Sequence, residues 1–339
     1  KVDPAETNAT LYLVNLYVGD GLKNFPEGSV KALRVCTFNY RYFGNGSTFT
    51  CAYEGGWDCR KVLGTVPVHP DGSALFRVPA NMPVYVQPLD AEGKAQAVMR
   101  SWYSAMPGEV GSCVGCHESQ NSASPAQMRT LAARAAPSEI ASWNGKPPRM
   151  FDFEADVQPL LNRKCVGCHD DGEKEKATGH PDFRDKRIRP ERQDEIPNWV
   201  SIGKVPGNPG WLAGQNRHLK EDGKFFSPAY MRLQRYVRRP GLEADYHLLP
   251  PAEFEADTSY LVKMLKKGHH GVELAKADWD VLYTWIDLNV PYYGRWTDCP
   301  LPPNPEHVAK RKKYAKLYWN RDEVDEDPIP VPPVAKFEP

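Results

Sequence analysis

This sequence of 339 residues has few cysteines, no net charge and no long apolar run. No stretch of eighteen apolar residues occurs, so no membrane-spanning helix is predicted. The 43 basic and 43 acidic residues cancel, which gives no basic surface for nucleic acid and no single-sign field to steer a partner. Lys1 opens a polar stretch and no signal sequence, so we expect a mature chain or a fragment of a longer one.

Although the chain has only 8 cysteines, four of them lie in two copies of one pentapeptide. The first motif is Cys113-Val114-Gly115-Cys116-His117, and the second is Cys165-Val166-Gly167-Cys168-His169. In C-x-x-C-H, the two thiols form thioethers with one porphyrin and the histidine faces the iron. The sequence therefore predicts two c-type haems, attached through Cys113 and Cys116 with His117, and through Cys165 and Cys168 with His169.

Two other interpretations of the motifs stay open. Structural zinc sites also use paired C-x-x-C sequences, and a thioredoxin-like dithiol uses one such pair, although it would not require histidine in both copies. No further motif indicates zinc or calcium. Because covalent haem attachment takes place outside the bacterial inner membrane, two c-type haems predict a periplasmic or extracellular protein.

Four cysteines remain outside the motifs: Cys36, Cys51, Cys59 and Cys299. An even remainder in an oxidising compartment is typical of one or two disulfides. We favour a disulfide between Cys51 and Cys59, because both lie in one loop-like stretch. The sequence does not decide the connectivity.

The first 145 residues predict a β-rich domain. Short runs of β-formers, separated by Gly- and Asp-containing turns, are expected to be strands. This pattern is typical of a sandwich-like fold, with the first motif at the C-terminal end of the domain. The expected strands cover residues 11–18, 32–38, 74–78, 84–89 and 97–103.

Residues 146–300 predict a mainly α-helical, cytochrome c-like domain carrying the second haem, so the fold class is α+β. Asp156 can cap a helix that holds Pro159 in its first turn and leads into the second motif. A helix from Tyr260 is expected to stop at Gly268, and another is expected to begin near Asp278. Residues 301–339 are expected to form an extended, charged and Pro-rich tail.

His269 is our candidate for the second axial ligand of the second haem, because it directly follows an apolar helix. The alternatives are His270, Met264, His247 and His218, or a surface role for His269 at the helix end. Two imidazoles keep an iron low-spin and closed to substrates. For the first haem His117 is the expected ligand, and the opposite side is open among His69, Tyr103, Met106, Met128 and His180.

Several segments resemble the family of the hydrazine synthase alpha subunit. That resemblance implies a β-rich middle domain with one c-type haem and an α-helical domain with a second haem, whose axial pair would be His169 and His269. In the family, a tyrosine four residues after the first motif binds the iron and the motif histidine turns toward zinc. Here that position is Asn121, so His117 is expected to bind iron as in ordinary cytochromes. The resembling segments are residues 64–68, 71–74, 78–83, 99–102, 107–109, 112–118, 153–169, 264–272 and 285–289.

These observations favour a dihaem c-type cytochrome that transfers electrons within a larger redox assembly. Its expected partners are redox proteins, other haem subunits among them, and an oligomer stays open. One alternative is a haem enzyme of the hydrazine synthase type, acting on small nitrogen or oxygen species at the first haem. Another is a filament-forming multihaem conduit. The sequence therefore leaves open whether the protein is an enzyme.

Overall fold

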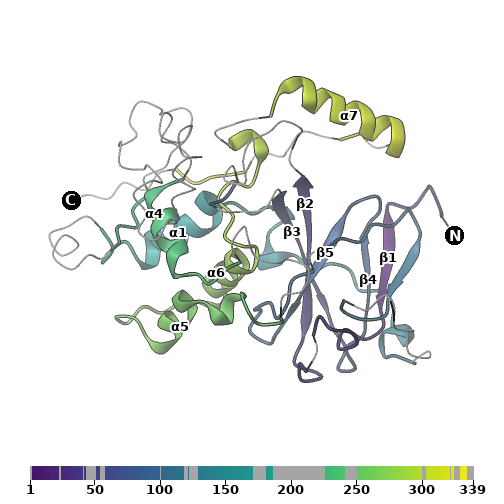
Figure 1. The fold of residues 1–339 in the computed structure, drawn as a ribbon, viewed down its shortest axis with the longest axis horizontal. Helices are drawn as coiled ribbons and strands as arrows, with labels where there is room; N and C mark the ends of the chain where they lie inside the picture. Colours follow the sequence, from purple (N-terminus) through teal and green to yellow (C-terminus); the bar gives the residue numbers. More distant parts are fainter. Residues whose placement is uncertain are drawn as a thin grey trace.

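Two β-sheets and a group of helices lie in three layers, with the larger sheet in the middle (Figure 1). The expected α+β class is confirmed. This computed structural model describes residues 2–22, 24–40, 42, 51–53, 58–99, 101–117, 121, 129–170, 181–185, 226–240, 250–299, 303–320, 322–323 and 329–333.

The two sheets pack against each other around a shared apolar core. Strand β1 pairs antiparallel with β4 and parallel with β6, in the order β4-β1-β6. The larger sheet is antiparallel, in the order β5-β2-β3-β7. Leu11, Phe76 and Leu33 belong to the core between them, which we call the sheet core. The strands are β1 (Asn8–Leu13), β2 (Ala32–Tyr40), β3 (Asp58–Pro67), β4 (Ala74–Pro79), β5 (Val84–Leu89), β6 (Val110–Cys113) and β7 (Arg149–Met150).

Strand β2 is buried on both faces. Because side chains alternate along a strand, Leu33 and Val35 enter the sheet core, while Cys36 and Phe38 join a second core beneath the helices. Arg34 also points to the helices, where its guanidinium donates to the Asp287 carboxylate over 3.1 Å. The larger sheet is therefore covered by β-structure on one side and by helices on the other.

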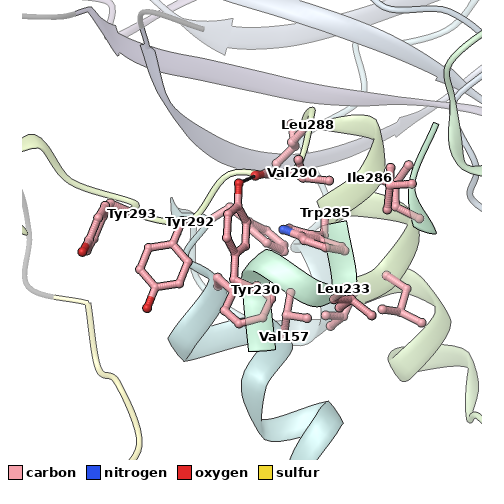
Figure 2. Packing of buried hydrophobic residues seen from close by; sticks show 14 of the residues in the cluster. Val157, Tyr230, Leu233, Trp285, Ile286, Leu288, Val290, Tyr292 and Tyr293 are labelled. Carbon is pink, nitrogen blue, oxygen red and sulfur yellow. Dashed lines mark hydrogen bonds between the residues drawn. The ribbon is translucent and has the colours of Figure 1, made fainter. Parts of the chain in front are cut away.

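The second core, which we call the helical core, is rich in aromatic rings (Figure 2). The Tyr230 hydroxyl donates to the Val290 carbonyl over 2.8 Å, and the Trp285 indole donates to the Pro291 carbonyl over 3.0 Å. These bonds satisfy the polar ends of rings that are otherwise buried. The helical elements are a π-helical turn (Phe153–Val157), α1 (Gln158–Lys164), α4 (Pro228–Leu233), α5 (Tyr260–Lys267), α6 (Lys276–Asp287), α7 (Pro305–Trp319), and short 3-10 turns at Ala132–Arg134, Trp143–Gly145, Gln234–Tyr236, Ala256–Thr258 and Trp296–Asp298.

The helices before and after His269 are confirmed. Helix α5 starts at Tyr260 and ends at Lys267, and Gly268 follows with φ of 100°, which favours glycine. Helix α6 begins two residues before the expected position. Pro159 does lie in the first turn of α1. The capping side chain upstream is Asp152, which accepts from the Ala155 amide over 3.0 Å, and Asp156 instead pairs with Arg149.

Three expectations about local structure were wrong. Residues 97–99 and 101–103 form no regular strand, although they run along β5: the Met99 amide donates to the Val86 carbonyl over 3.2 Å, and Tyr103 forms a single bridge with Val84. The first strand covers Asn8–Leu13 and not residues 11–18. The tail is not extended throughout, since Pro305–Trp319 is the helix α7, capped by Asn304, which crosses above the other layers in Figure 1.

Within the described residues, the helices are too short or too polar to cross a bilayer.

Candidate functional site

The second motif follows directly from the end of α1. Phe153 and Val157 are fully buried in the helical core, and Leu160 and Leu161 are nearly so, so this apolar face fixes the helix against the aromatic cluster. The chain then continues through one more turn: the Cys165 amide donates to the Leu161 carbonyl over 2.8 Å, and the His169 amide donates to the Cys165 carbonyl over 2.9 Å. This turn places Cys165 against the core, with His169 half-buried and Cys168 exposed.

The His169 ring is oriented by a backbone carbonyl. Its Nδ1 lies 2.9 Å from the Pro181 carbonyl oxygen, which requires Nδ1 to carry the proton and donate it. Metal-binding histidines are commonly held this way, because the bond fixes the tautomer and leaves Nε2 as the ligand atom. The Phe183 ring lies 4.8 Å from the His169 ring and is buried, so it supports the same orientation.

His269 faces His169 across a gap of defined width. The two ring centroids are 6.0 Å apart, and the rings are within 21° of parallel. Two imidazoles bound to opposite sides of one iron, each through a nitrogen about 2 Å from the metal, have centroids roughly 6 Å apart. The histidine pair therefore fits the axial ligation of a haem attached through Cys165 and Cys168.

His270, the neighbouring alternative, is placed differently. Its side chain is exposed, its backbone is left-handed with φ of 48°, and its ring lies at 78° to that of His269. Met264 packs at the edge of the helical core. His218 and His247 lie outside the described residues. Of the described candidates, His269 is the one whose ring lies opposite His169, with the centroids 6.0 Å apart.

The first motif is built on a β-strand and held by a loop. Cys113 is the last residue of β6, and the backbone of residues 15–21 binds the motif along its length. The Asn15 amide donates to the Val114 carbonyl, the Cys116 amide donates to the Val18 carbonyl over 2.8 Å, and the Asp20 amide donates to the His117 carbonyl over 3.1 Å. This motif is therefore a backbone-clamped turn on the edge of the smaller sheet.

The imidazole of the first motif is less enclosed than that of the second. His117 is exposed and has φ of 53°, whereas His169 is half-buried. Cys113 and Cys116 pack against the sheet core, so the thioether positions are on its border. An attached porphyrin would therefore rest against β-structure, with a side chain at its iron that reaches solvent.

Tyr103 is the described candidate that the structure brings closest to the first motif. Its hydroxyl occupies the space next to Gly111 where a Cβ atom would otherwise lie. Gly111 and Cys113 point to the same face of β6, because they are two residues apart in a strand. Burial, followed by the charges of Glu109 and Cys113, raises the pKa of the Tyr103 phenol. The hydroxyl is thus protonated and available as a hydrogen-bond donor beside the motif.

The remaining candidates at the first motif are placed elsewhere or are not described. Met106 is exposed. His69 lies in the turn before β4, where its amide donates to the Ser73 carbonyl. Met128 and His180 lie outside the described residues. Asn121, which stands where the family has its tyrosine, is exposed.

The two motifs do not share one metal site. The first motif packs on the sheet core and the second on the helical core, and no cluster of three His, Cys, Asp or Glu side chains suited to a metal ion occurs among the described residues. Burial raises the pKa of the Cys116 thiol to about 11 and that of Cys165 to about 11. A reactive dithiol needs a thiolate with a lowered pKa, so this environment disfavours the dithiol interpretation, and the packing of the two motifs on different cores disfavours one zinc site built from both pairs.

Two contributors to the second site could not be found from the sequence. Pro181 and Phe183 follow the motif by 12 and 14 residues, in a stretch without periodicity. A proline beyond a C-x-x-C-H motif is a weak signal, and only the fold shows that its carbonyl meets His169.

The expected pair of Cys51 and Cys59 has Sγ atoms 3.1 Å apart, but Cys299 lies equally close to Cys51.

Parts of this chain are similar to known proteins. Residues 28–118 match the family model described as the hydrazine synthase alpha subunit middle domain. Among solved structures, the chain is similar to Kuenenia stuttgartiensis hydrazine synthase, with 16% sequence identity and a TM-score of 0.52, over 88% of this chain and 44% of that one. No curated protein matches the chain.

The matched region runs from just before β2 to the first motif, and the similar fold extends into the helical layer. The chain spans less than half of the hydrazine synthase chain that it resembles. The resemblance to the hydrazine synthase alpha subunit family is therefore confirmed, through the middle-domain sequence of residues 28–118 and through the fold of most of the chain.

Proposed function

We propose that this protein is a dihaem c-type cytochrome of the hydrazine synthase alpha-like kind, and that it transfers electrons. The observation that carries the proposal is the parallel pair of His169 and His269, 6.0 Å apart. Cys165 and Cys168 would hold the second haem, and Cys113 and Cys116 the first. A c-type haem supplies one-electron redox chemistry.

The residues of the second site favour electron transfer over substrate binding. His169, fixed by the Pro181 carbonyl, and His269, which follows the end of α5, would both bind the haem iron. Cys165 packs against the helical core, whereas Cys168 is exposed. If both histidines bound the iron, no position would be left there for a substrate.

A second function, catalysis at the first haem, is favoured by a different observation. The His117 ring is exposed and the Tyr103 hydroxyl lies by the same strand face as Cys113. A protonated phenol at that place could donate a hydrogen bond to a small ligand. The second haem would then supply electrons to the first.

Localisation and partners belong to this proposal as well. Haem attachment implies the periplasmic or extracellular side of a bacterial membrane. Because the matched family model describes an alpha subunit, we propose other subunits of a redox assembly as partners, with a copy of this chain as a further option.

The proposal is tested by replacing His269 in the full haem-loaded chain. His269→Ala should convert one of two low-spin signals in electron paramagnetic resonance to high-spin, because an imidazole ligand is lost. The matched control is His270→Ala, which removes the adjacent exposed ring and should leave both signals unchanged. An unchanged spectrum in His269→Ala, or fewer than two haems per chain in the pyridine haemochrome assay, would contradict the proposal.

The two functions are separated by adding carbon monoxide to the reduced protein. Electron transfer through two closed haems predicts no change in the absorption spectrum. A shift that accounts for one haem per chain would instead establish an open first haem and favour the enzyme.

A further inference from the structure

Three cysteines outside the haem motifs meet inside the protein. The Sγ atom of Cys51 lies 3.1 Å from that of Cys59 and 3.0 Å from that of Cys299. All three side chains are within 4% of complete burial. Both separations are longer than the ~2.05 Å of a disulfide bond, so the structure holds three thiols in contact. We call them the thiol cluster.

Each member of the thiol cluster comes from a different part of the chain. Cys59 is in β3, where it pairs with Asn39 of β2. Cys299 follows the 3-10 turn Trp296–Asp298, beyond α6. Cys51 is in contact with both, and its carbonyl accepts from the amides of Tyr292 and Tyr293 over 3.0 and 2.9 Å. The backbone around Cys51 is thus fixed near both potential partners.

Cys51 can reach either partner with little movement, but it can bond only one at a time. Bonding to Cys59 would close a short loop within the β-structure. Bonding to Cys299 would join the β-structure to the segment that follows the helices. We propose that Cys51 is the shared member of two exchangeable disulfides, Cys51–Cys59 and Cys51–Cys299. This proposal does not depend on the haem proposal.

The chemistry is ordinary thiol–disulfide exchange. A disulfide-bearing protein or small molecule first oxidises two thiols of the cluster, forming one bond and being itself reduced to two thiols. Within the protein, the Cys299 thiolate then attacks Cys51 Sγ of the Cys51–Cys59 bond. The Cys51–Cys299 bond forms, and Cys59 leaves as a thiolate that takes up the proton lost by Cys299. This second step consumes no oxidant.

A metal ion fits the thiol cluster less well than a disulfide. Thiolates at about 2.3 Å around a tetrahedral zinc ion have sulfur atoms roughly 3.7 Å apart. The observed separations of 3.1 and 3.0 Å are shorter than that spacing, and no group of three side chains suited to a metal ion occurs among the described residues. Arg295 also engages the cluster, because the Cys299 thiol donates to its carbonyl over 3.3 Å, and this bond is one that a neutral thiol makes.

The experiment maps disulfides in the full chain. The protein is equilibrated in glutathione buffers of graded potential, alkylated, digested without reduction and analysed by mass spectrometry. The wild-type protein should yield both Cys51–Cys59 and Cys51–Cys299 peptides. Cys59→Ala should yield the Cys51–Cys299 peptide alone, and Cys299→Ala the Cys51–Cys59 peptide alone.

Thermal unfolding provides a second readout. The bond to Cys299 closes a much longer loop than the bond to Cys59, so oxidised Cys59→Ala should unfold roughly 5 °C above oxidised Cys299→Ala. Cys36→Ala is the matched control, because Cys36 is equally buried in the helical core on β2, and its loss should leave both Cys51 peptides in place.

Three results would overturn the proposal. One is a single Cys51 partner in the wild-type protein at every potential. Another is a Cys59–Cys299 peptide in place of both Cys51 peptides. The third is one metal ion per chain, measured by elemental analysis and released when any of the three cysteines is replaced.

Discussion

The same five residues, Cys-Val-Gly-Cys-His, occur in two different settings in this molecule. In the first motif, a Cβ atom on Gly115 would lie 2.2 Å from the Val18 carbonyl oxygen, whereas one on Gly167 in the second motif would meet no atom within 4 Å. The first motif is a turn clamped by backbone, and the second continues a helix. The comparison teaches that the same pentapeptide folds differently in the two places, so its surroundings decide how the histidine is oriented and what can approach it.

The largest effect is expected at the buried pair of Arg34 and Asp287, which joins the larger sheet to helix α6. Asp287→Ala should lower the free energy of unfolding by about 3–5 kcal/mol, because it leaves the Arg34 guanidinium buried without its carboxylate partner. The backbone amides of Ala95 and Ala256, which donate hydrogen bonds to the Asp287 carboxylate, also lose their acceptor. Denaturant unfolding measures this loss. Asp280→Ala, which removes the exposed pair with Lys276 on the same helix, should cost less than about 0.5 kcal/mol. Equal losses would refute the assigned role of the buried pair.

A direct comparison of the motifs comes from the two glycines. Gly115→Ala should lower the free energy of unfolding by about 1–3 kcal/mol, because its methyl group must displace the backbone of Val18. It should also reduce the first haem's occupancy in the haemochrome assay. Gly167→Ala places the same methyl group in open space and should leave stability and haem content unchanged. If Gly167→Ala proved as harmful, the difference between the two settings would not hold.

The smallest effect concerns acid stability near the first motif. Burial would raise the pKa of Asp71, but hydrogen bonds from the Ser73 hydroxyl and from the Leu131 and Ser73 amides outweigh it and lower that pKa. Asp71 therefore contributes stability above its unfolded pKa of about 4, and this contribution is lost as pH falls through the lowered folded value. Asp71→Asn should flatten the unfolding curve below about pH 4 and cost under about 1 kcal/mol at pH 7. An unchanged acid limb would argue against these bonds.

Local signals in the sequence are sufficient to predict the helices on either side of His269, α5 and α6. Helix α5 begins at Tyr260 and ends before Gly268 as expected, and α6 begins within two residues of the expected position, because caps and periodicity are short-range properties. Strand β3 was missed since its residues, from Asp58 to Pro67, alternate poorly and include Gly64. Its burial comes from β2 and from the helices, and neither neighbour is visible in a local window.

The two motifs can be recognised in the sequence, but most of their environment could not be predicted from it. Two C-x-x-C-H motifs are strong signals, and the pairing of His269 with His169 was expected from helix ends and from family resemblance. The Pro181 carbonyl, the Tyr103 hydroxyl beside Gly111 and the approach of Cys299 to Cys51 depend on contacts between distant segments. Such contacts arise only after the layers pack.

Strand β2 has a consequence for any attempt to divide the protein. A segment that contained only the helical half would leave its aromatic rings without the cover that Cys36 and Phe38 provide, and it would lose the guanidinium that neutralises Asp287. Such a fragment should be insoluble unless another β-sheet covers the apolar surface that the larger sheet now covers, unlike a free-standing cytochrome c. Strand β2 thus contributes side chains to both cores, so any substitution in it must be compatible with the packing on both of its faces.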